Sequence, residues 1–332
     1  TIGRRQRQMC IRDSSNTALG QGAMSSNTTG QNNTAVGHSA LVSSSGGGSA
    51  NVAVGKDALR NNSAGSNVAV GLSAINTNTS GEKNFAVGRE TLRNNTTADK
   101  NTGIGYQALY TNQTGTQNVA VGAFALDANT TASNNTAIGY ASLTNNTTGT
   151  QNTAIGKGTL ESNTTANDNT AVGNDALSDN TTGTENTALG QASLFKNTTG
   201  GQNTAIGVDA LRNSTTGGSN VAVGAAALDA NTTGAHNTGL GKDALVSNTT
   251  GSNNTGIGHK SLGGLNAASL TGSNNTATGY QALYRNTTGY SNVSIGTNTL
   301  YDNTTGYRNV AIGHGSLAVS YTHLRAHETR FY

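Results

Sequence analysis

A 17-residue repeat occupies almost all of this chain and constrains its fold more than any other feature. Asn begins each of eighteen copies, at positions 16, 33, 51, 67, 84, 101, 118, 135, 152, 169, 186, 203, 220, 237, 254, 275, 292 and 309. The interval is 17 except around Ser43–Ala50, where it is 18 and then 16, and around Gly263–Leu270, where it is 21. A short fixed period predicts a solenoid, with loops at one corner where residues are added.

Aligned in register, the copies share the consensus N-[TV]-[AG]-[VIL]-G-x-x-[AST]-L-x-x-N-T-T-G-x-x, and we number its positions 1 to 17 throughout. Positions 1 and 5 are Asn and Gly in all eighteen copies, and position 9 is Leu in sixteen, with Met24 and Ile75 in the other two. A β-branched segment followed by an unvarying Gly predicts a strand and then a turn, and 17 residues are too few for a two-helix repeat. We therefore predict an all-β chain, a β-solenoid (β-roll) of about eighteen 17-residue coils, whose parallel strands stack in register about 4.8 Å apart.

The alternation of side chains along a strand assigns a role to each column of the repeat. We expect two aliphatic columns in the coil interior, at position 4 (such as Val36 and Ile104) and at position 9 (such as Leu41 and Leu109). The small residues at position 3 are expected to form a smooth strip that suits subunit packing. The Gly column is expected to take a backbone conformation forbidden to residues with a Cβ, and the Asn column to hydrogen-bond from coil to coil.

The two ends of the chain, residues 1–13 and 319–332, do not share the repeat of residues 14–318. The strings RRQRQMCIRDS and VSYTHLRAHET resemble peptides produced when sequencing-adaptor DNA is translated together with a gene fragment. We expect both ends to be non-native or disordered and the true termini to lie outside this sequence. The ends hold six of the 19 basic and two of the 16 acidic residues, so the array has a formal charge of 13 − 14 = −1 instead of +3.

Composition excludes several classes of function for the repeat array. With 45 Gly, no Trp and 4% aromatic residues, the chain lacks the bulky side chains of an ordinary globular core. Its near-neutral charge offers no basic stripe for nucleic acid, and no apolar run approaches the roughly 20 residues of a membrane span. The single cysteine, Cys10, lies in the N-terminal end, so the array has no thiol nucleophile and no cysteine metal site. We predict a protein that is not an enzyme and has no cofactor.

Residues that break the repeat do not assemble a catalytic or metal site in this interpretation. Three histidines occupy position 6 of coils 2, 15 and 18: His38, His259 and His314. The closest two are three coils apart, about 14 Å, so we expect solvated turn histidines and no metal. Three aspartates occupy position 7 of coils 10, 12 and 14: Asp175, Asp209 and Asp243. Their separation of about 9.6 Å approaches that of inverting glycosidases, but Ala192 and Ala226 fill the positions between them and no pocket wall is visible. We therefore assign no catalytic, cofactor-binding or metal residue.

The strand motif is similar to that of a known family. The segments NTAVG (33–37), NTAIG (135–139, 152–156, 203–207) and NVAVG (51–55, 118–122, 220–224) resemble the head repeats of trimeric autotransporter adhesins, the YadA-like left-handed β-roll. The coil NTAIGYASLTNNTTGTQ (135–151) also resembles arrays in bacteriophage tail-fibre-like proteins. The resemblance covers most of residues 16–317 and implies a left-handed homotrimer, although the adhesin repeat is typically shorter than 17 residues.

Two hypotheses for function follow. The first is a structural or adhesive shaft or head segment of an extracellular, cell-surface or virion fibre, with copies of itself and a host surface glycan or receptor as partners. The alternative is an ice-binding solenoid, because the Asn-Thr-Thr turns stack one outward Thr column beside Asn. These turns also match the N-glycosylation pattern, which we attribute to the repeated turn. Eight tyrosines are expected to be exposed and available to stack on a sugar or receptor: Tyr106, Tyr110, Tyr140, Tyr280, Tyr284, Tyr290, Tyr301 and Tyr307.

Overall fold

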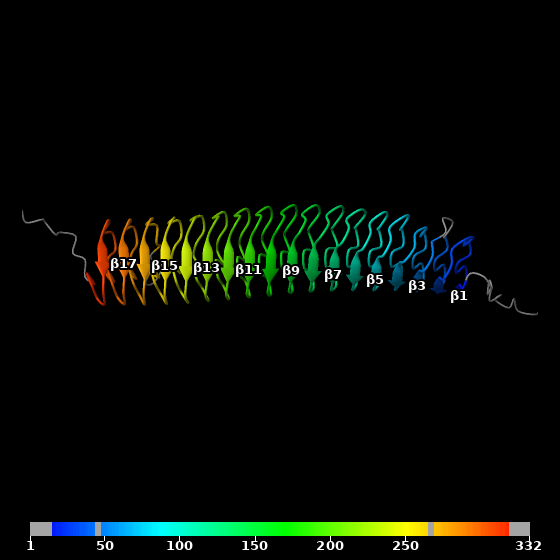
Figure 1. Cartoon of the computed structure of the whole chain (residues 1–332), viewed down its shortest axis with the longest axis horizontal. Helices are drawn as coiled ribbons and strands as arrows, with labels where there is room; N and C mark the ends of the chain where they lie inside the picture. Colours follow the sequence, from blue (N-terminus) through cyan, green and yellow to red (C-terminus); the bar gives the residue numbers. More distant parts are fainter. Residues whose placement is uncertain (1–14, 44–47, 265–268, 319–332) are drawn as a thin grey trace, which may run out of the picture. The chain divides into compact units, whose positions relative to one another are not determined.

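The computed structural model describes residues 15–43, 48–264 and 269–318, and these contain eighteen strands and no helix (Figure 1). The predicted all-β solenoid of about 17-residue coils is confirmed. The chain divides into two compact units, Thr1–Glu185 and Asn186–Tyr332, and each is described by itself. The division into 1–13, 14–318 and 319–332 stays a prediction, because both terminal segments lie outside the described residues.

Each strand is three residues long and covers positions 2 to 4 of the repeat. The first unit contains β1 (Thr17–Leu19), β2 (Thr34–Val36), β3 (Val52–Val54), β4 (Val68–Val70), β5 (Phe85–Val87), β6 (Thr102–Ile104), β7 (Val119–Val121), β8 (Thr136–Ile138), β9 (Thr153–Ile155) and β10 (Thr170–Val172). The second unit contains β11 (Thr187–Leu189), β12 (Thr204–Ile206), β13 (Val221–Val223), β14 (Thr238–Leu240), β15 (Thr255–Ile257), β16 (Thr276–Thr278), β17 (Val293–Ile295) and β18 (Val310–Ile312).

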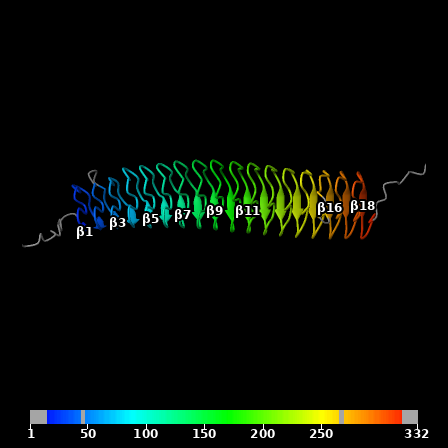
Figure 2. The same cartoon turned by 180° about the vertical axis from the view of Figure 1, so that it is seen from behind.

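Within each unit, every strand pairs in parallel with the next strand along the chain, and equal repeat positions lie opposite each other. In the first unit, Ala137 of β8 lies opposite Ala154 of β9. Register is kept across the irregular intervals too, since Thr255 pairs with Thr276 over 21 residues. Figures 1 and 2 show the strands of each unit side by side from opposite directions. The central parts of the two irregular stretches, 44–47 and 265–268, are outside the described residues.

The core of each coil consists of small side chains, one leucine and two asparagines. Ala, Gly or Ser at position 3, a small residue at position 8, Leu at position 9 and Asn at positions 1 and 12 are buried in nearly every described coil. In coil 8, for example, Ala137 and Leu143 are both 0% exposed. The predicted leucine column at position 9 is therefore confirmed as the apolar centre of the coil.

The two faces of the strands are reversed relative to the sequence-based expectation. Position 3 points inward, whereas position 4 faces solvent: Ala137 is 0% exposed and its neighbour Ile138 is 38% exposed. The expected position-4 core column is thus wrong, and so is the exposed position-3 strip. The coil is too thin for a large side chain on this face, because a Cβ on Gly103 would lie 2.6 Å from Cγ2 of Thr91 and 3.5 Å from Cδ1 of Leu92.

The predicted special conformation of the Gly column is confirmed. Gly at position 5 has φ between 111° and 140° throughout the described coils. A Cβ on Gly139 would also clash with the carbonyl oxygen of Gly156 in the next coil. Conformation and close backbone approach therefore both require glycine here.

Leu at position 9 also has a left-handed backbone, which the repeat pattern did not predict. Its φ lies between 48° and 55°, a conformation uncommon for residues other than Gly, Asn and Asp. The conformation is held by hydrogen bonds, since the N–H of Leu143 donates to the carbonyl of Thr159 at 3.0 Å and the N–H of Asn146 donates to the carbonyl of Leu143 at 3.1 Å. The turn thus directs an aliphatic side chain into the core, and its hydrogen bonds offset the local backbone strain.

The reversed faces predict a large difference between the same substitution at two adjacent residues. Ala137→Leu places a bulky side chain in the filled interior and should lower the free energy of unfolding by about 1–3 kcal/mol. Thr136→Leu changes an outward position that holds Phe85 in another coil, and the change should stay within about 0.5 kcal/mol. Urea titrations followed by circular dichroism measure both variants. Greater destabilisation by Thr136→Leu would contradict the assignment of the faces.

Candidate functional site

The asparagine at position 1 joins three segments of backbone. The Nδ2 group of Asn152 donates to the carbonyl of Ala166 at 2.8 Å and so closes its own coil. Its Oδ1 accepts a hydrogen bond from the N–H of Asn169 in the next coil at 3.1 Å. The pattern recurs along both units with fully buried side chains. The predicted coil-to-coil Asn ladder is confirmed, and its main links run from side chain to backbone.

A second buried ladder at position 12 was not identified from the sequence. The Nδ2 group of Asn146 donates to Oδ1 of Asn129 at 3.2 Å and to the carbonyl of Gly149 at 2.9 Å. This asparagine begins the Asn-Thr-Thr turn, whose recurrence at a fixed position was the available signal. Because Asn146 is fully buried, its amide is inaccessible to a glycosylating enzyme in the folded chain. The buried position supports the interpretation that the N-glycosylation pattern only reflects the turn.

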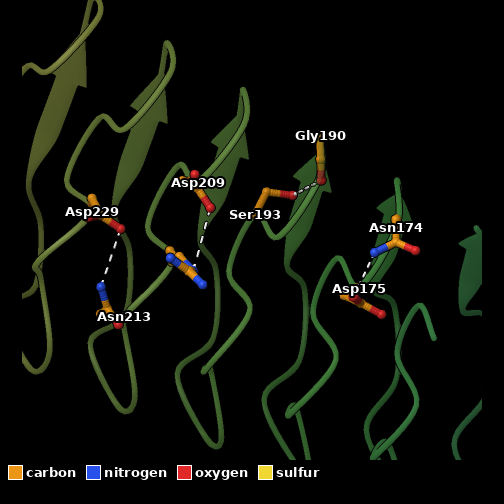
Figure 3. A network of polar contacts seen from close by, with 8 residues as sticks. Asn174, Asp175, Gly190, Ser193, Asp209, Asn213 and Asp229 are labelled. Atoms are coloured by element: carbon orange, nitrogen blue, oxygen red, sulfur yellow. Dashed lines mark hydrogen bonds and ion pairs between the residues drawn. The ribbon is translucent and has the colours of Figure 1, made fainter. Parts of the chain in front are cut away.

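The three aspartates at position 7 do not form one site. Asp209 lies 3.5 Å from Nε of Arg212, and Asp243 lies 3.5 Å from Nε2 of His259. In the first unit, Asp175 accepts a hydrogen bond from Asn174 at 2.6 Å, a pair that Figure 3 shows at close range. Each carboxylate therefore has its own local partner. Among the described residues, no group of three or more His, Cys, Asp or Glu converges as a metal site would require.

Two half-buried aspartates at position 10 have perturbed acidity. Burial raises the pKa of Asp229, and the nearby carboxylate of Asp209 raises it further, whereas Arg212 and Lys196 oppose the shift. Figure 3 shows Asn213 directed toward Asp229, with 3.3 Å between Nδ2 and Oδ1. Burial also raises the pKa of Asp127, against a 2.6 Å hydrogen bond from Thr144. A perturbed pKa is a reason to look for acid–base chemistry, but neither residue lines the surface notch near Tyr301 described below, and we interpret both as packing effects.

The histidines stay separate, as expected. His38 and His314 are exposed, and His259 contacts the ring of Tyr280 at 5.6 Å between centroids as well as Asp243. No described pair of histidines is joined by an interaction. Their placement supports the interpretation as turn residues at the surface.

The main apolar surface of both units is the outward side of the strands, here named the strand face and defined as positions 2 and 4 of β1–β18. In the first unit its exposed large apolar residues are Leu19, Phe85, Ile104, Ile138 and Ile155. In the second unit they are Leu189, Val221, Val223, Ile257, Ile295, Val310 and Ile312. Parallel sheets are normally covered on both sides, and a contiguous exposed apolar surface marks an interaction site. The strand face is therefore the leading candidate for a functional surface.

The Asn-Thr-Thr turns present a second regular surface. The first threonine is half-buried, and its hydroxyl is engaged: Oγ1 of Thr147 donates to the carbonyl of Thr164 at 3.1 Å. The second threonine, such as Thr148, is exposed. Each turn thus contributes one outward threonine, as the alternation of side chains predicts.

The tyrosines are only partly exposed. Five of the eight are exposed, but Tyr284 is 6% exposed and packs against Tyr301 with ring centroids 5.4 Å apart. The expectation of an exposed Tyr284 is therefore wrong, because side chains at position 10 of successive coils stack on one another. Tyr290 and Tyr307 form a parallel stack with centroids 5.0 Å apart. Aromatic surface in the second unit is thus organised in pairs at the turns.

Comparison with known proteins identifies no family for the chain, so the functional argument rests on the surfaces described above. No protein-family model matches the chain, and no curated protein matches it either. Within the described ranges, the structure contains no helix long and apolar enough to cross a membrane.

The position-12 ladder predicts that one natural interruption weakens the second unit. Ser214 occupies this position, and its Oγ is buried without a hydrogen-bond partner. Ser214→Asn should supply the missing amide links and raise the free energy of unfolding by about 1–2 kcal/mol, measured by urea titration. The reverse change in the first unit, Asn146→Ser, should lower it by about 1–3 kcal/mol. No gain from Ser214→Asn, or no loss from Asn146→Ser, would show that the ladder contributes little.

Proposed function

We propose that this chain is a structural or adhesive segment of an extracellular, cell-surface or virion fibre, in which the strand face packs against copies of the same chain. The observation that carries the proposal is the exposed aliphatic surface of a parallel sheet in both units. From the sequence alone, we expect subunit packing at position 3. The buried position 3 and the exposed positions 2 and 4 move the candidate interface to the other side of the strands.

A second copy is the partner that fits this surface best. Within each unit the strands stack in register, so one type of side chain recurs at the constant spacing of adjacent strands, about 4.8 Å. Another copy has the same spacing and can make equivalent contacts at every coil, whereas an ordinary globular surface matches only a few. Closed, symmetric assemblies are the usual outcome of self-complementary surfaces. The resemblance to YadA-like head repeats supports a left-handed homotrimer among such assemblies.

A noncatalytic role agrees with the way in which the polar and titratable side chains of the described residues are distributed along the array. The array presents similar side chains many times, whereas catalysis requires different side chains brought together once. The aspartates and histidines have separate local partners, and the near-neutral array has no basic stripe for nucleic acid. We propose that the turns, where residues vary most between coils, carry any contact with a host glycan or receptor.

Charges on the strand face should break the proposed assembly. Ile138→Asp combined with Ile155→Asp would bury two unpaired carboxylates in each copy of the interface, which should weaken association at least 100-fold. Analytical ultracentrifugation should show a trimer for the unchanged chain and a monomer for this double variant at the same micromolar concentration. The matched control, Thr148→Asp with Thr165→Asp, adds the same charge at exposed turn positions and should stay trimeric. A monomeric unchanged chain would contradict the proposal.

Ice binding is the second candidate, and one new observation favours it. Eleven of the eighteen position-2 residues are Thr, and they share the exposed strand face with the aliphatic residues of position 4. Flat arrays of hydroxyl and methyl groups therefore occur both on this face and at the second threonine of each turn. The two functions compete for the strand face, because a face covered by another copy is not available to ice.

Thermal hysteresis of the chain distinguishes the ice-binding surfaces. If the turn column binds ice, Tyr in place of Thr148, Thr165 and Thr182 should remove most of the hysteresis, since bulky rings prevent flat contact with the lattice. If the strand face binds ice, Tyr in place of Thr136, Thr153 and Thr170 should have this effect. Circular dichroism confirms that both triple variants fold. Absence of hysteresis in the unchanged chain rejects the ice-binding hypothesis.

A further inference from the structure

A notch in the second unit combines an aromatic ring with two amides. It has a volume of about 320 Å³, opens to solvent and is lined by Gln281, Asn298, Tyr301 and Ala318. The glutamine and asparagine occupy position 7 of coils 16 and 17, and the other two residues occupy position 10 of coils 17 and 18. The notch therefore lies among the turns and not on the strand face.

The notch exists because small side chains follow large ones in the stack. Tyr284 covers the ring of Tyr301 from the side of coil 16, with centroids 5.4 Å apart. On the side of coil 18, the equivalent residue is Ala318, which has only a methyl group. Gly315 leaves the neighbouring position empty as well, since a Cβ placed there would meet no atom within 4 Å. Among the described residues, only these small side chains lie beside the Tyr301 ring on the side of coil 18.

The polar wall of the notch has unused hydrogen-bonding capacity. Oδ1 of Asn298 is buried and has no hydrogen-bond partner. A ligand hydroxyl group that donates to this oxygen would supply the missing hydrogen bond. No protein hydrogen bond to this oxygen fixes the amide, so rotation of the side chain can present either its oxygen or its nitrogen to the notch. The four described residues that line the notch carry no charge.

The walls of the notch are held in place by neighbouring contacts. Arg285 forms a 2.8 Å ion pair with Asp302, and its guanidinium lies 5.4 Å from the centroid of the Tyr301 ring. The backbone of coil 18 is joined to coil 17, since the N–H of Asp302 donates to the carbonyl of Ala318 at 2.9 Å. A ligand would therefore meet a largely preformed surface, which lowers the entropic cost of binding.

The same pentapeptide, YQALY, occurs at 106–110 in the first unit and at 280–284 in the second, but its surroundings differ. In the first unit, Nε2 of Gln107 donates to Oε2 of Glu90 at 2.9 Å, and Nη1 of Arg93 donates to the hydroxyl of Tyr110 at 2.8 Å. Phe124 and Asp127 stand at the positions that Asn298 and Tyr301 have in the second unit, and Thr144 stands at that of Ala318. The first copy therefore lacks the tyrosine face and the second amide that the notch combines.

We infer that this notch binds one neutral sugar ring of a surface glycan. The face of Tyr301 on the side of coil 18 accepts the C–H face of a pyranose, and the amides of Asn298 and Gln281 exchange hydrogen bonds with its hydroxyl groups. The volume lies at the lower end for ligand pockets and suits a single ring. This inference rests on the adhesive part of the proposed function and identifies its partner chemistry. The notch stays accessible when the strand face is covered, because it lies at the turns.

Saturation-transfer NMR on the full chain tests the inference with methyl glucoside, methyl galactoside, methyl mannoside and N-acetylglucosamine as probes. At least one neutral sugar should give a saturable signal. Tyr301→Ala should weaken this binding at least tenfold by removing the stacking surface. Ala318→Tyr should do the same by extending the natural tyrosine stack over this face. The matched control Tyr110→Ala, in the first copy of the pentapeptide, should bind as the unchanged chain does.

Several outcomes would overturn the inference. Absence of a saturable signal from every probe, or binding that survives Ala318→Tyr, would exclude the notch as the site. Circular dichroism confirms the fold of each variant, and the two substitutions act in opposite directions on volume, so a shared loss is not explained by one packing defect. Ultracentrifugation of the same samples separates this result from the proposed assembly: a monomer that binds sugar contradicts the trimer alone, and a trimer without sugar binding contradicts the notch alone.

Discussion

The hydrogen bonds of the buried asparagines are the interaction on which the rest of this structure depends. Each coil has only three strand residues, so most of its backbone lies in turns, where the backbone hydrogen bonds between coils leave the position-1 N–H and the position-15 carbonyl to the asparagine side chains. Asn152 closes its own coil through Nδ2 and binds the next coil through Oδ1. Asn146 donates to the carbonyl of Gly149 in its own coil and to Oδ1 of Asn129 in the preceding coil. An Asp side chain in place of Asn would have no N–H donor, and a Leu side chain would have neither a donor nor an acceptor. Only an amide of this length satisfies donor and acceptor together in a core where an unpaired polar group is costly.

The thinness of the coil then decides which residues lie outside. The interior accommodates a leucine at position 9, and the strand opposite it contributes only the small side chains of Ala, Gly or Ser, since even a Cβ at Gly103 would press against Thr91. The larger aliphatic residues of position 4 must therefore face outward, although burial of apolar surface is the main driving force of folding. A coil that fills its core with small residues has apolar side chains left over. Covering them requires a surface outside the coil, and this requirement links the packing of single residues to the proposed self-assembly.

Features set by one column of the repeat could be predicted from the sequence, whereas features set by contacts between columns could not. The fold class, the Gly conformation and the position-1 ladder follow from residues that recur at a single position. Alternation establishes that positions 2 and 4 share a face but leaves open which face is inward, and the uniformly small position 3 was the overlooked signal. Tyr284 was expected at the surface because its burial depends on Tyr301, one coil away. The notch likewise depends on Gly315 and Ala318, whose importance is evident only when the turns are stacked.

The ligand-binding residues of this architecture can change without loss of the fold, because the residues that stabilise the coil and the residues that vary between coils occupy different repeat positions. Asn, Gly and Leu at positions 1, 5 and 9 supply the hydrogen bonds, the turn and the apolar centre, and they are nearly constant from coil to coil. Positions 6, 7 and 10 carry side chains as different as Tyr, Lys, Asp and Ala, and their main structural effect is on the adjacent coils. A ligand site therefore arises where two neighbouring coils differ in side-chain size at these positions. The step from Tyr301 to Ala318 is such a difference, and it places an aromatic face beside two amides on an otherwise repetitive surface.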